Sequence, residues 1–173
     1  GREDILELVD DDEWERFHAV ESDTSSGILV LTAHLGNWEI LASYLGLRSE
    51  RPCYAIARKT TNQRLEADLI LPLRRKFGNG VIYKKRALLG TIKALKKGCH
   101  VGILVDQKAS HRFGVPVRFF GQEVFAVATP AQLQVRMGIP VVPVFMIRTD
   151  TGRYRLVVEQ PIPVPDQDHS EDE

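Results

Sequence analysis

Short apolar runs alternate with longer amphipathic stretches along most of this chain. Runs of this kind, bounded by turn residues, are typical of strands buried on both faces, and they fall at residues 27–33, 53–58, 80–83 and 101–106. Apolar positions three and four apart predict helices at about 37–47, 62–78 and 86–98. Strands that alternate with helices are typical of right-handed β-α-β units, so we expect an α/β fold with a largely parallel central sheet flanked by helices.

The pattern changes towards both ends of the chain. Residues 3–20 have near-helical apolar spacing and predict an acidic amphipathic helix or a pair of helices. In the second half, residues 115–126 predict two short strands about Gly121, and residues 139–148 and 154–160 predict two more, which give a mixed or antiparallel C-terminal portion. Between them we expect a helix over 129–138, with Thr129 as N-cap, Pro130 at its first position and Gly138 as its end. We also expect Pro72 to interrupt the 62–78 helix and Gly78 to end it.

The length and composition fit one globular domain, since 173 residues with 43 % hydrophobic side chains can bury a core. We divide the chain into an acidic helical segment (1–26), a main domain (27–160) and a Pro-rich, acidic tail (161–173). The longest apolar run, 139–147, contains two prolines and is too short to span a bilayer. Because the chain starts at Gly1 without an initiator Met, we expect it to be a fragment of a longer protein.

A net charge of zero hides a strong segregation of charge. Residues 1–26 hold ten acidic and two basic side chains, whereas residues 58–97 hold twelve basic and two acidic ones. The basic stretch predicts an anionic partner, such as phosphates, an acidic protein or a membrane surface; a solvated helix face is the plainer alternative. It lacks the aromatic interleaving and the motifs typical of nucleic-acid binding, so we expect no nucleic-acid partner.

Several kinds of chemistry are not indicated. Cys53 and Cys99 do not form a C-x-x-C motif, so we expect reduced core thiols and no metal site. A G-x-S-x-G elbow, a Walker loop and a G-x-G-x-x-G fingerprint are all missing, which disfavours an acyl-serine enzyme and nucleotide-driven chemistry. Four histidines lack a setting that suggests chemistry and are assigned to the surface or the core: His18, His100, His111 and His169.

Polar side chains follow three predicted strands at the points where the strands end. His34 follows the first strand, Arg58 ends the second, and Asp106 and Gln107 follow the fourth. In an open parallel sheet, ligands bind beyond the carboxyl ends of the strands. We therefore expect these side chains to gather on one rim and form a site.

The stretch LTAHLGNWEIL (31–41) places Glu39 five residues after His34. A carboxylate that accepts from one ring nitrogen fixes the tautomer and stabilises the imidazolium that forms when the other nitrogen takes a proton. Five positions are not a same-face helical spacing, so this pair requires His34 to lie in a turn before the helix, which Gly36 permits. An ordinary strand-end histidine beside a solvated glutamate is the alternative.

Four segments carry a resemblance to a known family: AHLGNWE (33–39), AIAR (55–58), GTIKALKKGCHVGILVDQ (90–107) and FFGQEVFAVATPAQL (119–133). From about Gly27 to Gln160 the chain resembles the late acyltransferases of lipid A biosynthesis, the lauroyl and myristoyl transferases of Gram-negative bacteria. The resemblance implies an acyltransferase-like fold and transfer of an acyl chain from acyl carrier protein to a hydroxyl of a phosphorylated glucosamine-disaccharide lipid. It also implies no metal or cofactor, and a place at the cytoplasmic face of the inner membrane.

By the same resemblance, His34 is the general base and Glu39 is its orienting partner. Arg58 and Asp106 are expected near the head group or the reacting carbonyl, and we add Gln107 and Asn37 as substrate-binding or transition-state residues. Arg58 and the backbone N–H groups that follow His34 are alternative oxyanion donors. An acyl-CoA-dependent glycolipid or phospholipid acyltransferase, a hydrolase, and a non-catalytic module that binds anionic lipid remain as alternative functions.

Overall fold

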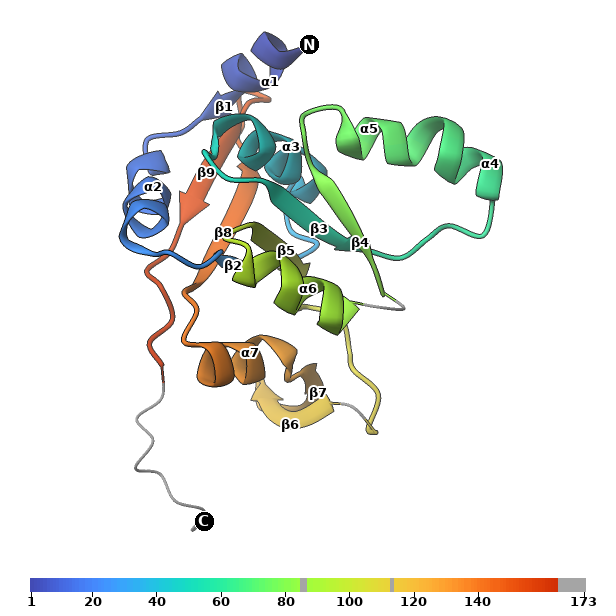
Figure 1. The fold of residues 1–173 in the computed structure, drawn as a ribbon, viewed down its shortest axis with the longest axis vertical. Coiled ribbons are helices and arrows are strands. Elements are labelled where there is room, and N and C mark those ends of the chain that lie inside the picture. Colours follow the sequence, from blue (N-terminus) through green and yellow to red (C-terminus); the bar gives the residue numbers. More distant parts are fainter. Residues whose placement is uncertain (85–86, 113, 165–173) are drawn as a thin grey trace.

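The fold is an α/β sandwich around a mostly parallel seven-stranded sheet, with a separate antiparallel hairpin (Figure 1). The computed structural model describes residues 1–84, 87–112 and 114–164. In chain order its elements are α1 (Arg2–Leu8), β1 (Val9–Asp10), α2 (Trp14–Asp23), β2 (Leu29–Thr32), α3 (Trp38–Arg48), β3 (Cys53–Ala57), α4 (Gln63–Leu65), the π-helical turn η1 (Glu66–Ile70), α5 (Leu71–Arg75), β4 (Gly80–Tyr83), α6 (Ala87–Lys96), β5 (His100–Leu104), β6 (Gly114–Phe119), β7 (Gln122–Val127), α7 (Thr129–Met137), β8 (Val141–Arg148) and β9 (Tyr154–Val158).

The main sheet has the strand order β1-β9-β8-β2-β5-β3-β4. Strands β8, β2, β5, β3 and β4 run parallel, whereas β9 is antiparallel to β8 and pairs in parallel with β1. The predicted α/β class, parallel centre and mixed C-terminal portion are therefore confirmed. The expected break at Gly121 is confirmed as well, because Gly121 lies in the turn of the β6–β7 hairpin.

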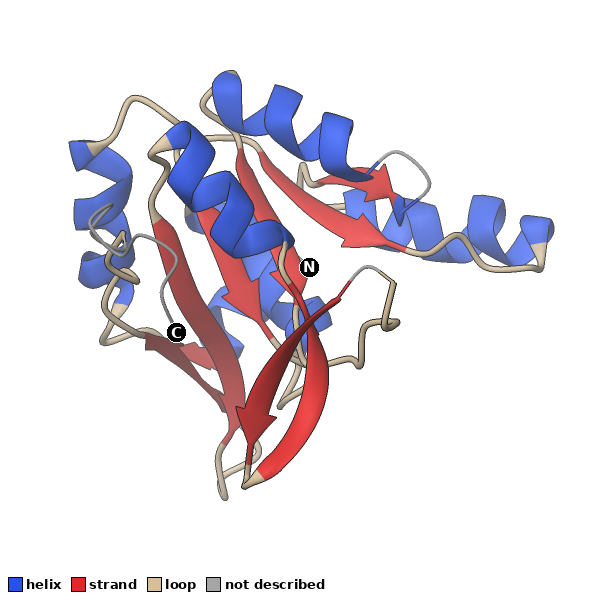
Figure 2. Ribbon diagram, turned by 90° about the horizontal axis from the view of Figure 1, so that it is seen from below, coloured by secondary structure: helices blue, strands red, loops and turns tan. Residues whose placement is uncertain are grey.

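Helices cover both faces of the sheet (Figure 2). On one face α1, α2 and α3 pack over Val30, Val142 and Val144. On the other face α6 and α7 pack over Leu29 and Val101. Neighbouring residues of β2 thus belong to different clusters, which explains why its sequence is continuously apolar and does not alternate.

The structure corrects two local predictions and adds a strand to a third. Residues 63–75 form one continuous helix through Pro72, because the π-helical turn before it widens the backbone where the proline ring would clash with the preceding turn. Thr129 is the first helical residue and Ala128 is the N-cap, since the Ala128 carbonyl accepts the first helical hydrogen bond, from Gln132 N–H (3.0 Å). The predicted pair of N-terminal helices is confirmed, and the short strand β1, which pairs with β9, lies between them.

Two other local predictions are confirmed. Gly138 has a left-handed φ of +63° at the end of α7, and Cys53 and Cys99 are buried free thiols. No helix within the described ranges is long and apolar enough to cross a bilayer. The acidic end of the predicted tail, from residue 165 on, lies outside the described residues.

Candidate active site

His34 and Asp106 meet at the carboxyl edge of the sheet. Strands β2 and β5 are parallel neighbours with Thr32 opposite Leu104, so the residues two positions beyond each strand face each other. The Asp106 carboxylate accepts two hydrogen bonds from His34: Nδ1 lies 2.9 Å from Oδ1, and the backbone N–H donates to Oδ2 at 2.9 Å. The structure thus brings these two residues together on one rim, as expected.

The contact with Asp106 assigns the tautomer of His34. An ionised carboxylate only accepts hydrogen bonds, so Nδ1 carries the proton and Nε2 keeps its lone pair. Burial by itself would raise the pKa of the Asp106 carboxyl, but the hydrogen bonds from the His34 side chain and backbone outweigh it and hold this pKa below its ordinary value. Asp106 is therefore ionised at neutral pH, and Nε2 is the ring atom able to take a proton.

The residues around the imidazole fix its place. The ring packs edge-on against Trp38, with centroids 4.7 Å apart, and Nε2 lies 3.5 Å from the Gln107 side-chain nitrogen. Asn37 caps α3, because its Oδ1 accepts from Ile40 N–H (3.0 Å) while its Nδ2 donates to the Tyr154 hydroxyl (3.3 Å). Asn37 was expected to bind substrate, but here both ends of its amide are engaged within the protein.

Glu39 is not bonded to His34 in the described structure. It lies in the first turn of α3, and its carboxylate accepts two hydrogen bonds from Arg74 of α5, one from Nη2 (2.6 Å) and one from Nε (3.3 Å). The position expected for Glu39 beside the ring is filled by Asp106. The His34–Glu39 pair therefore remains a prediction from the sequence, and the structure offers Asp106 as the orienting carboxylate.

A cavity of about 700 Å³ opens at this rim. It exists because β3 and β5 pair only from Cys53↔His100 to Ala55↔Gly102, whereas β3 follows β4 to Ala57 and β5 follows β2 to Leu104. The strands diverge beyond Ala55 and Gly102, and the small side chains there leave space beneath α3. His34, Glu39, Arg58 and Gln107 line the cavity, so four of the predicted site residues share it.

Two lining residues were not singled out from the sequence. Thr32 ends β2 and is buried, and its hydroxyl has no hydrogen-bond partner among the described residues. Arg74 is one of many basic residues in the sequence, and it lines the cavity only because α5 packs against α3. A hydroxyl in the last position of the apolar run GILVLT was the available signal for Thr32; we find no comparable signal for Arg74.

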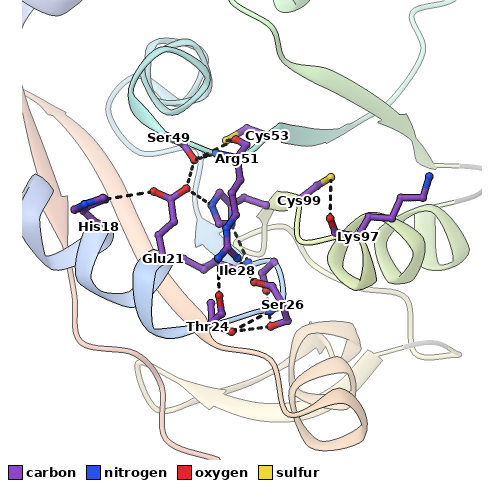
Figure 3. A network of polar contacts seen from close by, with 12 residues as sticks. His18, Glu21, Thr24, Ser26, Ile28, Ser49, Arg51, Cys53, Lys97 and Cys99 are labelled. Atoms are coloured by element: carbon purple, nitrogen blue, oxygen red, sulfur yellow. Dashed lines mark hydrogen bonds and ion pairs between the residues drawn. The ribbon is translucent and has the colours of Figure 1, made fainter.

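The buried end of the cavity is closed by a polar cluster. His100 lines the cavity, and both His100 and Glu21 of α2 are 1 % exposed. His100 Nδ1 accepts from Ile28 N–H (2.9 Å), so its Nε2 carries the proton and donates to Glu21 (2.7 Å). Ser49 also donates to this carboxylate, at 2.5 Å, and His18 lies 3.6 Å away on its other side (Figure 3). The cluster ties α2 to the sheet through a neutral histidine and an ionised glutamate.

This cluster predicts an acid-sensitive fold. Burial lowers the pKa of His100 more than Glu21 raises it, so the pKa in the folded protein lies below the ordinary value near 6.5. At a pH between these two values, His100 is protonated in the unfolded chain and neutral in the folded protein, which favours unfolding. Burial raises the pKa of Glu21, but the hydrogen bonds from Ser49 and His100 outweigh burial and hold this pKa below its ordinary value. The contribution of Glu21 to stability is therefore lost at still lower pH. We expect the free energy of unfolding, measured by urea denaturation, to fall as the pH drops below about 6.5.

Two variants separate this effect from a general loss of stability. His100→Gln should flatten the pH dependence just below about 6.5, because the titrating group is gone. Ser49→Ala should lower stability at every pH and keep that dependence, since the histidine remains. A slope that is the same in His100→Gln and in the unchanged protein contradicts the assignment.

Comparison with known families adds an independent finding. A family model described as bacterial lipid A biosynthesis acyltransferase matches residues 4–173, which is nearly the whole chain. No curated protein matches the chain. The match includes α1 and α2 as well as the sheet, so the acidic N-terminal segment is part of the matched region.

Proposed function

Since the chain belongs to the bacterial lipid A biosynthesis acyltransferase family, and is therefore an acyltransferase, we propose that it moves a fatty acyl chain from acyl carrier protein to a hydroxyl of a phosphorylated glucosamine-disaccharide lipid. The observation that carries this proposal is the bidentate contact of Asp106 with His34 at the mouth of the cavity. It leaves one basic nitrogen at the entrance of a space lined largely by apolar side chains. We place the reaction at the cytoplasmic face of the inner membrane, where a carrier protein and a lipid can meet.

His34 acts as the general base in this proposal. Nε2 takes the proton of the acceptor hydroxyl as its oxygen attacks the thioester carbonyl, and a tetrahedral intermediate forms. The intermediate collapses with cleavage of the carbon–sulfur bond, and the imidazolium returns its proton to the departing thiolate. Asp106 stabilises the imidazolium through Nδ1, which is the role expected of Glu39 from the sequence.

The oxyanion needs a donor, and two side chains that line the cavity are candidates. Arg58 follows β3 on the rim, is exposed, and carries a permanent charge. The Thr32 hydroxyl is buried, lines the cavity and has no partner among the described residues. We assign the thioester carbonyl to Thr32 and the phosphates of the acceptor to Arg58, because a buried unpaired hydroxyl costs free energy until a ligand satisfies it. Gln107 remains available to orient the attacking hydroxyl.

Glu39 acts through Arg74 in this proposal. Its carboxylate holds the guanidinium, which is about one quarter exposed, against the cavity wall that both residues line. Further exposed basic side chains lie on the neighbouring elements at residues Lys59, Arg64, Arg75, Lys76 and Lys84. This surface suits the acidic carrier protein, and Arg74 would serve the acceptor phosphates together with Arg58.

The acyl chain of the donor is assigned to the cavity, and Gly102 provides a test. A Cβ at this glycine would lie 3.7 Å from the Tyr54 carbonyl oxygen, so alanine fits, whereas the larger branched side chain of valine enters the cavity. We expect Gly102→Val to shift the preference towards shorter acyl chains by about tenfold in relative kcat/KM. The measurement is a competition between carrier proteins loaded with chains of different length. Gly102→Ala is the control, and an unchanged preference in Gly102→Val places the chain elsewhere.

The experiment that tests the function is acyl transfer from labelled acyl carrier protein to a phosphorylated disaccharide lipid. Formation of the acylated lipid supports the proposal. Transfer from acyl-CoA alone corrects the donor, and release of free fatty acid without an acceptor indicates a hydrolase. Lipid binding without any turnover indicates the non-catalytic module.

A further inference from the structure

The β6–β7 hairpin ends in a turn with a backbone conformation that is unfavourable for one of its two residues, Phe120. The two strands pair from Gly114↔Val127 to Phe119↔Gln122, so the turn consists of Phe120 and Gly121. Both have positive φ, +49° and +76°, which is the pattern of a type I′ turn. This turn prefers Asn, Asp or Gly at its first position, and Phe120 is the only residue other than glycine with positive φ in the described part of the chain.

Packing within the molecule does not account for Phe120. Its side chain is 91 % exposed and that of Phe119 is 62 % exposed, and the two rings contact each other edge-on at 4.6 Å. An aromatic residue here adds neither a turn hydrogen bond nor a buried contact, and it adopts a backbone conformation that disfavours any side chain with a Cβ. Transfer of both rings into an apolar environment outside the protein would be favourable.

The hairpin connects this tip to the active site. Val115 and Val117 share one face with Phe119 and are exposed, so an apolar surface continues along the strand. At the base, Val127 and Thr129 line the same cavity as His34. The six residues of each strand span about 20 Å. Figure 1 shows the hairpin at the end of the molecule opposite the N-terminus.

Charge and chemistry favour a bilayer as the occupant of this surface. The exposed Arg118 lies beside the rings, with Glu123 opposite it. The exposed Lys108 precedes the hairpin and lies away from the tip, since the N–H of its neighbour Ala109 donates to the Phe125 carbonyl. Aromatic side chains next to basic ones are typical of segments that lie in an anionic membrane interface. The family acts on a lipid, so the cavity mouth has to reach a membrane surface.

We propose that the β6–β7 hairpin is an interfacial anchor, in which Phe119 and Phe120 insert into an anionic bilayer and hold the cavity mouth at its surface. The inference rests on the proposed function only in that the acceptor is a membrane lipid. It concerns attachment and not catalysis, so it is tested without turnover.

The test is sedimentation of the full chain with vesicles of phosphatidylethanolamine and phosphatidylglycerol. We expect Phe119→Ser combined with Phe120→Asn to weaken vesicle binding by about tenfold or more, because two rings lose their apolar environment. Phe120→Asn alone should weaken binding and raise the Tm, since asparagine suits the turn, which excludes misfolding as the cause. Phe120→Trp should retain binding and give a blue-shifted fluorescence on vesicles relative to the unchanged protein.

Two outcomes overturn the anchor, and a third overturns only the proposed function. Vesicle binding that the double variant retains in full shows that other residues attach the protein. A self-association that the double variant abolishes, without any effect on vesicles, identifies a second copy of the chain as the occupant. If the double variant loses vesicle binding but the unchanged protein transfers no acyl chain, the anchor stands and only the proposed function is overturned.

Discussion

Replacing His34 by alanine is expected to lower kcat for acyl transfer by about 10²–10⁴-fold, the usual contribution of a positioned general base. Nε2 is the ring nitrogen of His34 that keeps its lone pair, since Nδ1 donates to Asp106, and Gln107 contacts it only at 3.5 Å. Binding of the acceptor should change little, because the rest of the cavity is intact. The measurement is steady-state transfer together with direct binding of the lipid acceptor.

The control for His34→Ala is His111→Ala, which removes an exposed histidine that contacts Phe125 and does not line the cavity. Its activity should match that of the unchanged protein. Undiminished transfer in His34→Ala contradicts general-base catalysis by this residue. A parallel loss of acceptor binding would instead assign His34 to the binding of the lipid.

Replacing Asp106 by asparagine is expected to lower kcat by about 10²–10³-fold, close to the loss of the base itself. Asp106 accepts from both Nδ1 and the backbone N–H of His34, and an amide offers one oxygen and one NH₂ group. If the oxygen accepts from the backbone, the NH₂ donates to Nδ1 and the ring proton moves to Nε2, which removes the base. If the amide takes the opposite orientation, its NH₂ group faces the His34 backbone N–H. Two donors then face each other, and the ring loses its position.

Glu39→Gln is the matched variant for this test, because it neutralises the other carboxylate of the site with the same change of atoms. Glu39 bonds to Arg74 and not to His34, so we expect its effect to fall mainly on KM for the acceptor. If Glu39→Gln lowers kcat as much as Asp106→Asn and leaves KM unchanged, the pair expected from the sequence is the catalytic one, and the contact with Asp106 belongs to a resting arrangement.

The contact between His34 and Asp106 could be predicted from the sequence because it follows from one general rule of parallel sheets. Two parallel neighbouring strands bring the residues beyond their carboxyl ends to the same edge. What the sequence did not contain was which of the nearby carboxylates would bond to the ring. That choice follows from the register Thr32↔Leu104 and from the packing of α5 on α3, and both depend on tertiary contacts.

The cavity shows the same division between local and long-range information. The strands that contain Ala55 and Gly102 were predicted at the correct places, but their divergence is a property of the whole sheet, since each strand follows its other neighbour. The sequence also did not predict that the helix continues through Pro72. Propensity marks the proline as a break, whereas the π-helical turn that accommodates it is stabilised by Glu66, which is buried and accepts from Thr60 N–H and the Tyr83 hydroxyl.

The loop that carries His34 is fastened to two strands at once. The His34 N–H is bonded to Asp106 after β5, and the Asn37 N–H is bonded to the Met146 carbonyl on β8. Gly36 makes this possible, because its φ is +63° and a Cβ there would overlap the Met146 carbonyl oxygen at 2.0 Å. The proposed base is thus held in place by the fold itself, before any substrate arrives. The entropy of ordering it is lost once, during folding, and does not have to be lost again in each catalytic cycle.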